Sequence, residues 1–418
     1  MTNPFASLGL SRALVRAASD RGYAEPTAIQ AAAIPAALAR RDVLASAQTG
    51  SGKTAAFALP ILQQLEGIRR EAPRRTHALV LVPTRELAAQ VGESMRDLAQ
   101  HLAAPVKVAI VFGGVSINPQ MLALRGGADL VVATPGRLLD LIDHHALRLS
   151  DLDVLVLDEA DRLLSLGFAD ELGRVRALLP PSCRKLLFSA TFPAAVRTLV
   201  DGLLHDPAGI NIDAGATPDA AAIVQRAIEV DTDRRTTLLR HLLQAHGWSR
   251  VLVFVATKYA TEHVALKLRR AGIAAAPLHG ELSQGTRTQA MADFKAGRTQ
   301  VLVATDLAAR GLDIVELPAV VNYDLPRSAV DYLHRIGRTG RAGKLGVAVS
   351  FITAATSAHF DLIERRHRLS IEREHIIGFE PTEGAVAPQH PHGGIKGRRK
   401  SKKDKLREAA ARARNTKT

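Results

Sequence analysis

The chain has 418 residues and carries 55 Lys and Arg against 41 Asp and Glu, a formal net charge of +14. A hydrophobic content of 47% and a charged content of 23% are ordinary for globular domains and exclude wholesale disorder. The single cysteine, Cys183, excludes a disulfide framework within the chain and a cysteine-based zinc or iron–sulfur site. The N-terminus lacks a signal-peptide pattern and no apolar run approaches a membrane span, so we expect a soluble, cytoplasmic protein with no membrane partner.

Short apolar runs alternate with helix-like segments through the first half of the chain. Helices are predicted at 85–101 and 136–142, among others. The runs are apolar throughout rather than at every second residue, which indicates strands buried on both faces of a parallel sheet. The strands predicted here are 43–47, 78–82, 106–111, 130–133, 154–157 and 186–188.

The alternation pauses at 205–219, where Pro and Gly stand among small residues, a composition typical of a linker. A second series of strands is predicted at 251–255, 274–278, 301–304, 319–322 and 347–351. The pattern indicates an α/β fold of two tandem domains, each a mostly parallel sheet flanked by helices. The predicted parts are a leading region at 1–31, a first domain at 32–208, a linker at 209–222, a second domain at 223–375 and a basic, disordered tail at 376–418.

The positive charge is concentrated at the C-terminal end. Residues 391–418 hold eleven Lys and Arg against two acids, a net charge of +9 that leaves +5 for the first 390 residues. No apolar face accompanies these charges, so nucleic acid is the predicted partner, and a solvated solubility tail is the alternative. Aromatic residues make up only 4% of the chain, which argues against base stacking as the main mode of recognition.

The strongest motif directly follows the first predicted strand. It has the spacing of a phosphate-binding loop, with Ala in place of the first Gly, and its small residues let backbone N–H groups surround phosphate oxygens at a helix N-terminus. Lys53 is predicted to contact the β- and γ-phosphates, and Thr54 to bind Mg²⁺. The residues expected to bind ATP here are Ala47, Gln48, Thr49, Gly50, Ser51, Gly52, Lys53 and Thr54.

Two acids, Asp158 and Glu159, come directly after the strand predicted at 154–157. An acid at a strand end is what Mg²⁺ beside a phosphate loop requires, so Asp158 is predicted to hold the metal. Glu159 is predicted to polarise the water that attacks the γ-phosphate. An acidic helical turn favoured by the helix dipole is the alternative, and the presence of the phosphate loop makes it the weaker one.

A candidate base-recognition segment lies upstream of the first strand. A Gln side chain can pair with N6 and N7 of adenine, so Gln30 is predicted to read the base and Phe5 to stack on it. Without other motifs, such a segment is more often an ordinary helix-start loop.

With these residues in place, the sequence resembles the DEAD-box RNA helicases of superfamily 2, and among them the bacterial RhlE type. The resemblance covers about residues 3–375 and implies two RecA-like domains, with ATP and Mg²⁺ as cofactors. The motifs that carry it, in the family's order, are Phe5 with 22–30, 47–54, 83–88, Gly113 with Gly114, 134–137, 158–161, 189–191, 254–257, Gln284 with Arg287, 304–313 and 334–341.

The resemblance implies roles for further residues. It places Tyr23, Thr27 and Asp313 at ATP, and makes Arg338 and Arg341 arginine fingers, whose spacing of three lets them share a helical face. Residues expected to couple the nucleotide state to domain geometry are Asp161, Ser189, Thr191, Asp306 and His334. Residues expected to contact RNA are Pro83, Thr84, Arg85, Gly114, Thr134, Pro135, Gly136, Arg137, Thr257, Gly280, Arg287 and Thr305.

The expected function is that of an ATP-dependent RNA helicase that grips the RNA backbone and locally unwinds short duplexes or remodels RNA–protein complexes. Hydrolysis is expected to require closure of the two domains. RNA is the expected partner of a monomeric core, and ribosomal-precursor and RNA-decay assemblies are settings typical of the family. An ATP-gated RNA clamp or annealing module is one alternative, and a DNA translocase of the same superfamily is another.

Overall fold

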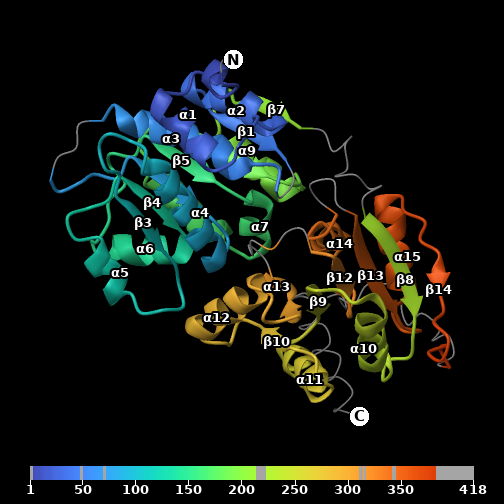
Figure 1. Ribbon diagram of the computed structural model, residues 1–418. Helices are drawn as coiled ribbons and strands as arrows, with labels where there is room; N and C mark the ends of the chain where they lie inside the picture. The colour runs from blue at the N-terminus through green and yellow to red at the C-terminus, as the bar shows by residue number, and fades with distance from the viewer. Residues whose placement is uncertain are drawn as a thin grey trace, which may run out of the picture. The chain divides into compact units, whose positions relative to one another are not determined.

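The computed structural model describes residues 3–47, 50–68, 72–212, 223–309, 314, 317–340 and 345–382. They form two compact units, and each unit is built around a seven-stranded sheet in which every neighbouring pair of strands is parallel. Both sheets are flanked by helices (Figure 1). This confirms the predicted α/β fold of two domains. In the described part of the chain, no helix is long and apolar enough to cross a membrane.

The first unit has the strand order β3-β4-β2-β5-β6-β1-β7. Its strands are β1 (Val43–Ser46), β2 (Ala78–Leu81), β3 (Val108–Val111), β4 (Leu130–Ala133), β5 (Val154–Leu157), β6 (Arg184–Ser189) and β7 (Ala208–Asn211). Its helices are the 3-10 helix η1 (Ala6–Leu8), α1 (Arg12–Asp20), α2 (Ala28–Leu38), α3 (Lys53–Glu66), α4 (Arg85–Ala99), α5 (Asn118–Ala123), α6 (Pro135–Asp143), α7 (Ala160–Ser165), α8 (Ala169–Ala177) and α9 (Ala194–Leu203).

Two apolar cores lie on opposite faces of the first sheet. Val80 of β2 packs in one core with residues of α1 to α4, whereas its neighbours Leu79 and Leu81 pack in the other with residues of α6 to α8. Successive side chains of a strand point to opposite faces, so a strand that is covered on both faces must be apolar throughout. This is the physical reason for the continuous apolar runs in the sequence.

The second unit repeats the arrangement with the strand order β10-β11-β9-β12-β13-β8-β14. Its strands are β8 (Ile223–Glu229), β9 (Val251–Val255), β10 (Ala275–Leu278), β11 (Val301–Thr305), β12 (Ala319–Asn322), β13 (Gly346–Ile352) and β14 (Arg373–Glu374). Its helices are α10 (Arg235–His246), α11 (Lys258–Arg270), α12 (Gln284–Lys295), α13 (Asp306–Ala309), α14 (Ala329–Ile336) and α15 (Ser357–His367). Residues of α10 and α11 share one core, and residues of α14 and α15 share another.

Two predicted boundaries are wrong. The linker expected at 209–222 overlaps β7, which pairs with β1 over the register Val43–Ala208 to Ser46–Asn211. Gly209 sits within this short, half-exposed edge strand, where little apolar surface marks it in the sequence. Residues 213–222 lie outside the described part of the chain.

The second boundary is the start of the tail at 376. Ile376 and Phe379 pack against the core of the second unit. The Thr382 hydroxyl and backbone N–H both donate to the Asp231 carboxylate, at 2.8 and 2.9 Å. The second unit therefore continues to at least residue 382, and the expected disorder of the rest of the tail concerns residues outside the described ranges.

Candidate functional site

The predicted phosphate loop connects β1 to α3 at the carboxyl edge of the first sheet. Gly50 and Gly52 have φ of 83° and 94°, a left-handed backbone that favours glycine, and α3 begins at Lys53. A Cβ on Gly52 would stand 2.4 Å from Nε2 of Gln30, so any other residue would also displace the Gln30 side chain. The loop thus brings a helix N-terminus to the sheet edge, where it can bind an anion. Gln48 and Thr49 lie outside the described residues.

Lys53 is held along this loop. Its side chain is buried, and Nζ donates a hydrogen bond to the carbonyl oxygen of Ala47 at 3.1 Å. An ammonium group has three N–H donors, so donors remain for a phosphate oxygen. Burial of a cation beside one carbonyl is costly in water-free surroundings, and an anionic ligand offsets that cost.

Gln30 ties the upstream segment to the phosphate loop. Its Oε1 accepts from the backbone N–H of Thr27 at 3.0 Å, and its Nε2 donates to the carbonyl oxygen of Gly52 at 3.1 Å. An amide has two N–H donors and two lone pairs on its oxygen, so one of each remains. Recognition of adenine by Gln30 is compatible with this geometry and stays a prediction.

Phe5, which is predicted to stack on the base, is a buried ring, and its stacking role stays a prediction. Phe5 has no exposed surface and packs in the core of the first unit. Its ring centroid lies 6.4 Å from that of Tyr23, at an interplanar angle of 34°. Phe5 therefore supports Tyr23, which is only half-buried and is the ring of this pair that a ligand can reach. The sequence marked an aromatic residue at the right place but could not show which of the two rings faces outward.

The two acids after β5 are buried at the same edge as the phosphate loop. Burial raises the pKa of Asp158 to about 6, against the opposing effect of Lys53 and with Glu159 adding to the rise. Asp158 Oδ1 accepts from the backbone N–H of Glu159 at 2.9 Å. Glu159 adopts φ 52° and ψ 52°, and its Oε2 lies 3.4 Å from Nε of Arg162 but has no hydrogen-bond partner. Residues with such a backbone cluster at functional sites.

These acids fit a divalent cation held mainly by a nucleotide. No group of three or more His, Cys, Asp and Glu that could hold a metal occurs within the described ranges. Mg²⁺ characteristically takes one or two protein oxygens and completes its shell with phosphates and water. The raised pKa of Asp158 shows that its ionised form is costly in this buried site, and a bound cation would offset that cost.

Asp161 joins the acid segment to the end of β6. Its Oδ2 accepts from the hydroxyl and the backbone N–H of Thr191, at 2.6 and 3.1 Å. The backbone N–H of Asp161 donates to Oγ of Ser189 at 3.3 Å, and that hydroxyl donates to the Thr191 carbonyl at 2.7 Å. Three of the five residues expected to couple nucleotide state to geometry thus form one hydrogen-bonded cluster.

The RNA contacts expected in the first unit come from loops after β2, β3 and β4, which are neighbours in the sheet. Arg85 Nη1 donates to the carbonyl oxygen of Gly114 at 3.3 Å, and the Gly113 N–H donates to Oγ1 of Thr134 at 3.3 Å. Gly114 has φ 76°, and a Cβ there would stand 2.6 Å from the Arg85 guanidinium. Pro83 and Thr84 lead into α4, and Pro135 and Gly136 open α6.

Arg137, in the first turn of α6, joins this helix to the loop after β3. It is buried, and its Nη2 donates to the carbonyl oxygen of Val115 at 2.7 Å. Its Nε lies 3.5 Å from the Asp140 carboxylate, while Nε and Nη1 are buried without a hydrogen-bond partner. Unsatisfied guanidinium donors at a sheet edge are suited to an anion such as an RNA phosphate.

The second unit presents its expected RNA contacts in the same way. Thr257 follows β9 and caps α11, accepting from the N–H of Ala260 at 3.1 Å. Gly280 follows β10, Thr305 ends β11, and Arg287 lies buried on α12. Strands β10, β11 and β9 are neighbours, so these loops share one edge of the second sheet.

Arg335 is a residue whose importance the sequence did not reveal. It is 2% exposed, and its guanidinium forms two hydrogen bonds with the Asp306 carboxylate, at 2.6 and 2.7 Å. It also donates to Asn322 Oδ1 at 3.0 Å and stands 4.8 Å from the centroid of the Phe254 ring. Arg335 therefore joins three motifs that the sequence had marked separately. Its position next to His334 was the available signal.

The remaining predicted residues are only partly described. His334 lies on α14, and Arg338 follows that helix and is buried. Ser51 and Thr54 belong to the phosphate loop and the first turn of α3. Asp313 and Arg341 lie outside the described residues.

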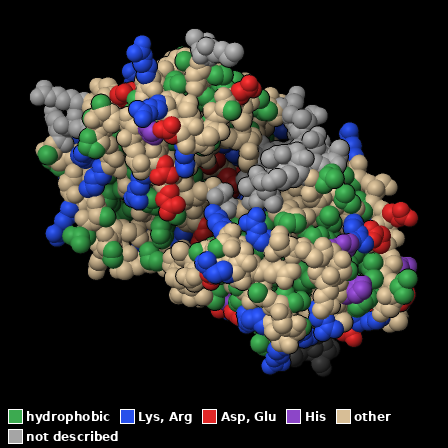
Figure 2. All heavy atoms as spheres, in the orientation of Figure 1, with side chains coloured by type: hydrophobic (Ala, Val, Ile, Leu, Met, Phe, Trp, Pro, Cys, Tyr) green, Lys and Arg blue, Asp and Glu red, His purple; other side chains and the backbone are tan. Residues whose placement is uncertain are grey.

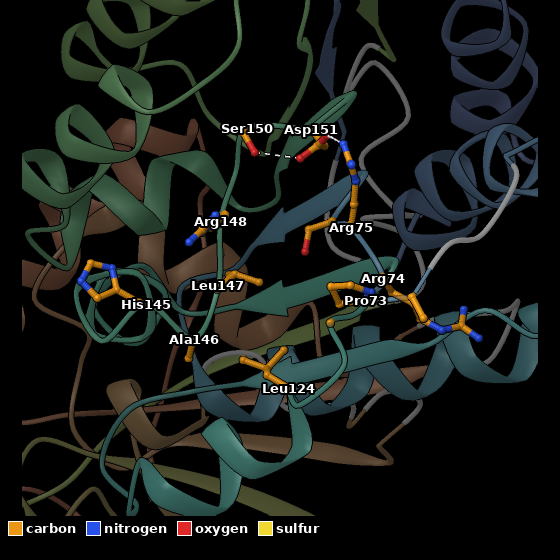
Figure 3. A pocket seen from close by; sticks show the side chains of 13 residues that line it. Pro73, Arg74, Arg75, Leu124, His145, Ala146, Leu147, Arg148, Ser150 and Asp151 are labelled. Carbon is orange, nitrogen blue, oxygen red and sulfur yellow. Dashed lines mark hydrogen bonds and ion pairs between the residues drawn. The ribbon is translucent and has the colours of Figure 1, made fainter.

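A separate cavity of about 620 Å³ lies at the opposite edge of the first sheet (Figure 3). Its lining comes from the segments that precede β2, β4 and β5, and includes Pro73, Leu124 and Leu147. Arg75 and Ser150 both hydrogen-bond to the Asp151 carboxylate at 2.7 Å, and these bonds lower its pKa. Since the phosphate loop and Asp158 lie at the carboxyl ends of the strands, this cavity is distinct from the candidate site.

Matches to protein-family models show to which family the chain belongs. The model of the DEAD/DEAH box helicase matches residues 27–199, and that of the helicase conserved C-terminal domain matches residues 234–343. The chain belongs to the DEAD-box helicases. It is an ATP-dependent RNA helicase, an enzyme whose ATP hydrolysis is stimulated by RNA.

Relatives of this DEAD-box helicase cover most of its length. It is 43% identical over 354 residues to the ATP-dependent rRNA helicase rrp3 of Sclerotinia sclerotiorum, covering 84% of this chain and 72% of the relative. It is 44% identical over 376 residues to the ATP-dependent RNA helicase DeaD of Mycobacterium tuberculosis, covering 90% of this chain and 65% of the relative. The structure of Saccharomyces cerevisiae Dbp5 bound to RNA and ADP BeF3 is similar with a TM-score of 0.79 and 32% identity, over 90% of this chain and 96% of that one.

Proposed function

We propose that this helicase grips the backbone of one RNA strand and uses ATP-driven closure of its two domains to separate short duplexes or remodel RNA–protein complexes. The observation that carries the proposal is that the expected RNA contacts and the nucleotide residues occupy two adjoining parts of the same edge of the first sheet. Loops after the neighbouring strands β3, β4 and β2 hold the predicted RNA contacts, and loops after β5, β6 and β1 hold the nucleotide residues. Nucleotide and RNA would then bind side by side on one rigid element.

Within this proposal, Lys53 binds the β- and γ-phosphates, and Thr54 and Asp158 hold Mg²⁺, the latter through water. Magnesium supplies charge neutralisation at the transferring phosphoryl group. Glu159 orients the attacking water, and Arg338 and Arg341 of the second unit stabilise the charge that develops during transfer. The cluster of Asp161, Ser189 and Thr191 supports a coupling role, because a shift of the acid segment must also shift the end of β6.

The backbone contacts support binding without strong sequence preference. Each loop offers hydroxyls, N–H groups or a guanidinium, which suit phosphate and sugar rather than base edges. We also propose that the protein is of the bacterial RhlE type, acts in the cytoplasm as a monomeric core, and works on ribosomal precursors or in RNA decay. The name of the Sclerotinia relative, an rRNA helicase, supports the first of these two settings.

The basic tail is proposed to add electrostatic attraction for RNA. On the face in Figure 2, Lys and Arg side chains lie in small groups between Asp and Glu side chains. Residues 391–418 carry +9 of the total charge of +14, so the excess of positive charge is in the tail. Such a segment binds polyphosphate through counterion release and without base recognition.

The test is ATP hydrolysis and strand separation by the full-length protein. We expect hydrolysis to rise with a single-stranded RNA and not with DNA of the same sequence, because only the 2′-hydroxyl and the thymine methyl distinguish the strands. A short labelled RNA duplex should separate in ATP, and Lys53→Ala should lose both activities because the phosphates lose their cation. Equal stimulation by DNA would favour a translocase, and duplex formation without separation would favour an annealing module.

A further inference from the structure

Helix α11 of the second unit, labelled in Figure 1, carries an exposed pair of rings. Tyr259 is 73% exposed, and its ring lies 5.6 Å from the ring of His263 at an interplanar angle of 15°. The two residues are four apart in sequence, so they lie one above the other on the same helix face. Among the large apolar side chains that are exposed in the described ranges, Tyr259 is the aromatic one.

The pair has a free aromatic face. One face of the Tyr259 ring is covered by His263, and an exposure of 73% leaves the other open to solvent. An aromatic ring in water buries little area where it stands, so its position contributes little to folding. A stacked neighbour restricts the orientations open to the ring, which lowers the entropy that a ligand stacking on it would lose.

Tyr259 lies at the edge that holds the expected RNA contacts of the second unit. It is two residues beyond Thr257, which caps α11 after β9. The neighbouring Lys258 pairs with Glu281, which adjoins Gly280 in the loop after β10. Tyr259 therefore lies next to the loops after β9 and β10, from which contacts with the RNA backbone are expected.

The charges around the ring are compatible with a polyanion. Lys267 and Arg270 are exposed on the same helix. Of the nearby acids, Glu281 is neutralised by Lys258, and Glu262 Oε1 lies 3.0 Å from Nε2 of His279. Glu281 therefore adds no net charge beside the ring, and the Glu262 carboxylate is engaged in a hydrogen bond with His279.

We propose that Tyr259 is a stacking platform for an unpaired RNA base, with His263 supporting the ring from behind. The proposal rests on the proposed function and adds a base contact to a grip that otherwise involves the backbone. Every base has a π-face, so the contact would raise affinity without imposing a sequence. It also explains why a ring stands exposed in a chain with only 4% aromatic residues.

The test compares two strands that share a backbone but differ in bases. Affinity of the full-length protein is measured for a single-stranded oligoribonucleotide and for an abasic ribose-phosphate strand of the same length. We expect Tyr259→Ala to weaken binding to the normal strand by about 5- to 150-fold, the range for loss of one base–aromatic stack, and to leave binding to the abasic strand unchanged. Tyr259→Phe should bind both strands as the wild type does, because the ring is kept.

Two further variants separate stacking from general effects of the helix surface. His263→Ala should weaken binding to the normal strand by less than Tyr259→Ala does, since the platform remains but is less ordered. Leu266→Ala removes exposed apolar surface one turn beyond His263 on α11. It should change the affinity neither for the normal strand nor for the abasic strand. A loss for Tyr259→Ala that is equal on both strands, or no loss on the normal strand, would overturn the proposal. Failure of the wild type to bind the normal strand would instead contradict the proposed function.

Discussion

Asp158 follows β5 in the first sheet and Asp324 follows β12 in the second, and the two sheets place these strands at the same position in the same order. Asp324 is neutralised: Arg235 donates to its Oδ1 at 2.6 Å, and the N–H of Ala256 donates to its Oδ2 at 2.8 Å. Asp158 lies buried beside Glu159, and its pKa is raised to about 6. Both sheets place an aspartate after the equivalent strand. The surrounding side chains decide whether that aspartate forms a structural ion pair or can bind a cation.

The hydrogen-bonded clusters of the two units also differ in the charge of their central residue. In the first unit, the carboxylate of an acid, Asp161, accepts from the hydroxyl and the backbone N–H of Thr191, and the Asp161 N–H donates to Ser189 Oγ. In the second unit, a cation, Arg335, collects acceptors from Asp306 and Asn322. The first unit thus concentrates carboxylates around its nucleotide loop, and the second carries the arginines proposed to stabilise an anionic transition state.

The largest effect that would test this division is expected for Arg338→Ala. Loss of an arginine finger should lower ATP turnover by about 10³-fold. ATP binding in the absence of RNA should change little, because the phosphate loop belongs to the first unit. Turnover and nucleotide affinity are measured in parallel, and an equal loss in both would assign Arg338 to ground-state binding instead.

Arg335→Met should chiefly affect stability. The substitution leaves the Asp306 carboxylate without its cation, and breaking a buried ion pair costs about 3–5 kcal/mol. The matched control is Arg226→Met, which breaks a more exposed pair with Glu374 at the sheet edge and should cost about 1 kcal/mol or less. Urea unfolding of both variants gives the comparison, and equal losses would show that Arg335 is not the central contact of the second unit.

The two aspartates should respond to neutralisation with opposite signs. Burial raises the folded-state pKa of Asp158 from 3.8 to about 6, so its ionised form destabilises the protein at pH 7, by about 3 kcal/mol. Asp158→Asn should remove this cost at pH 7 and have no such effect below about pH 4, where the carboxyl is protonated in both states. Asp324→Asn should destabilise the second unit at pH 7, because Arg235 loses its partner.

Unfolding of each variant is followed at both pH values. Destabilisation of the protein by Asp158→Asn at pH 7 would contradict the view that this carboxylate awaits a cation. Binding of Mg²⁺ with ATP to the free wild type should likewise weaken as the pH drops through about 6, since the metal must then displace the proton of Asp158.

The smallest of these effects is expected for removal of the tail after Pro391. This removes +9 of charge, so RNA affinity should fall and depend less on salt. For each RNA phosphate that the truncated protein no longer neutralises, the slope of log affinity against log salt should become shallower by about 0.7 on single strands. Turnover at saturating RNA should stay as it is, because the residues proposed for catalysis precede the tail. Parallel salt slopes for the full-length and truncated proteins would make the tail a solubility segment.

The sequence was sufficient for the parts of the fold that are buried on both faces. Strands β4, β5, β9 and β12 begin and end where predicted, because these short runs, rich in β-branched residues and bounded by polar or turn residues, are too short for buried helices. Strands β7, β8 and β14 were missed. Each is only partly buried, and their pairing with β1, β13 and β8 depends on contacts far away in the sequence.

In the site, too, features set by local sequence were predicted and contacts between distant residues were not. Local spacing revealed the phosphate loop, whose function depends on small consecutive residues and a following helix. It could not show that Phe5 is buried behind Tyr23, or that Arg335 joins Asp306, Asn322 and Phe254. These contacts link residues that are distant in the chain, and only the packed structure brings them together.

The proposed coupling of hydrolysis to RNA release is tested most directly by the Glu159→Gln variant. Asp158 and the phosphate loop are unchanged in it, so ATP and RNA should still bind, while hydrolysis stops because the water loses the carboxylate that orients it. The measurement is the rate at which a labelled RNA leaves the full-length variant in ATP and in ADP. A long-lived complex in ATP and rapid release in ADP are predicted. Release in ATP as fast as from the wild type would contradict both the role of Glu159 and the coupling of hydrolysis to RNA release.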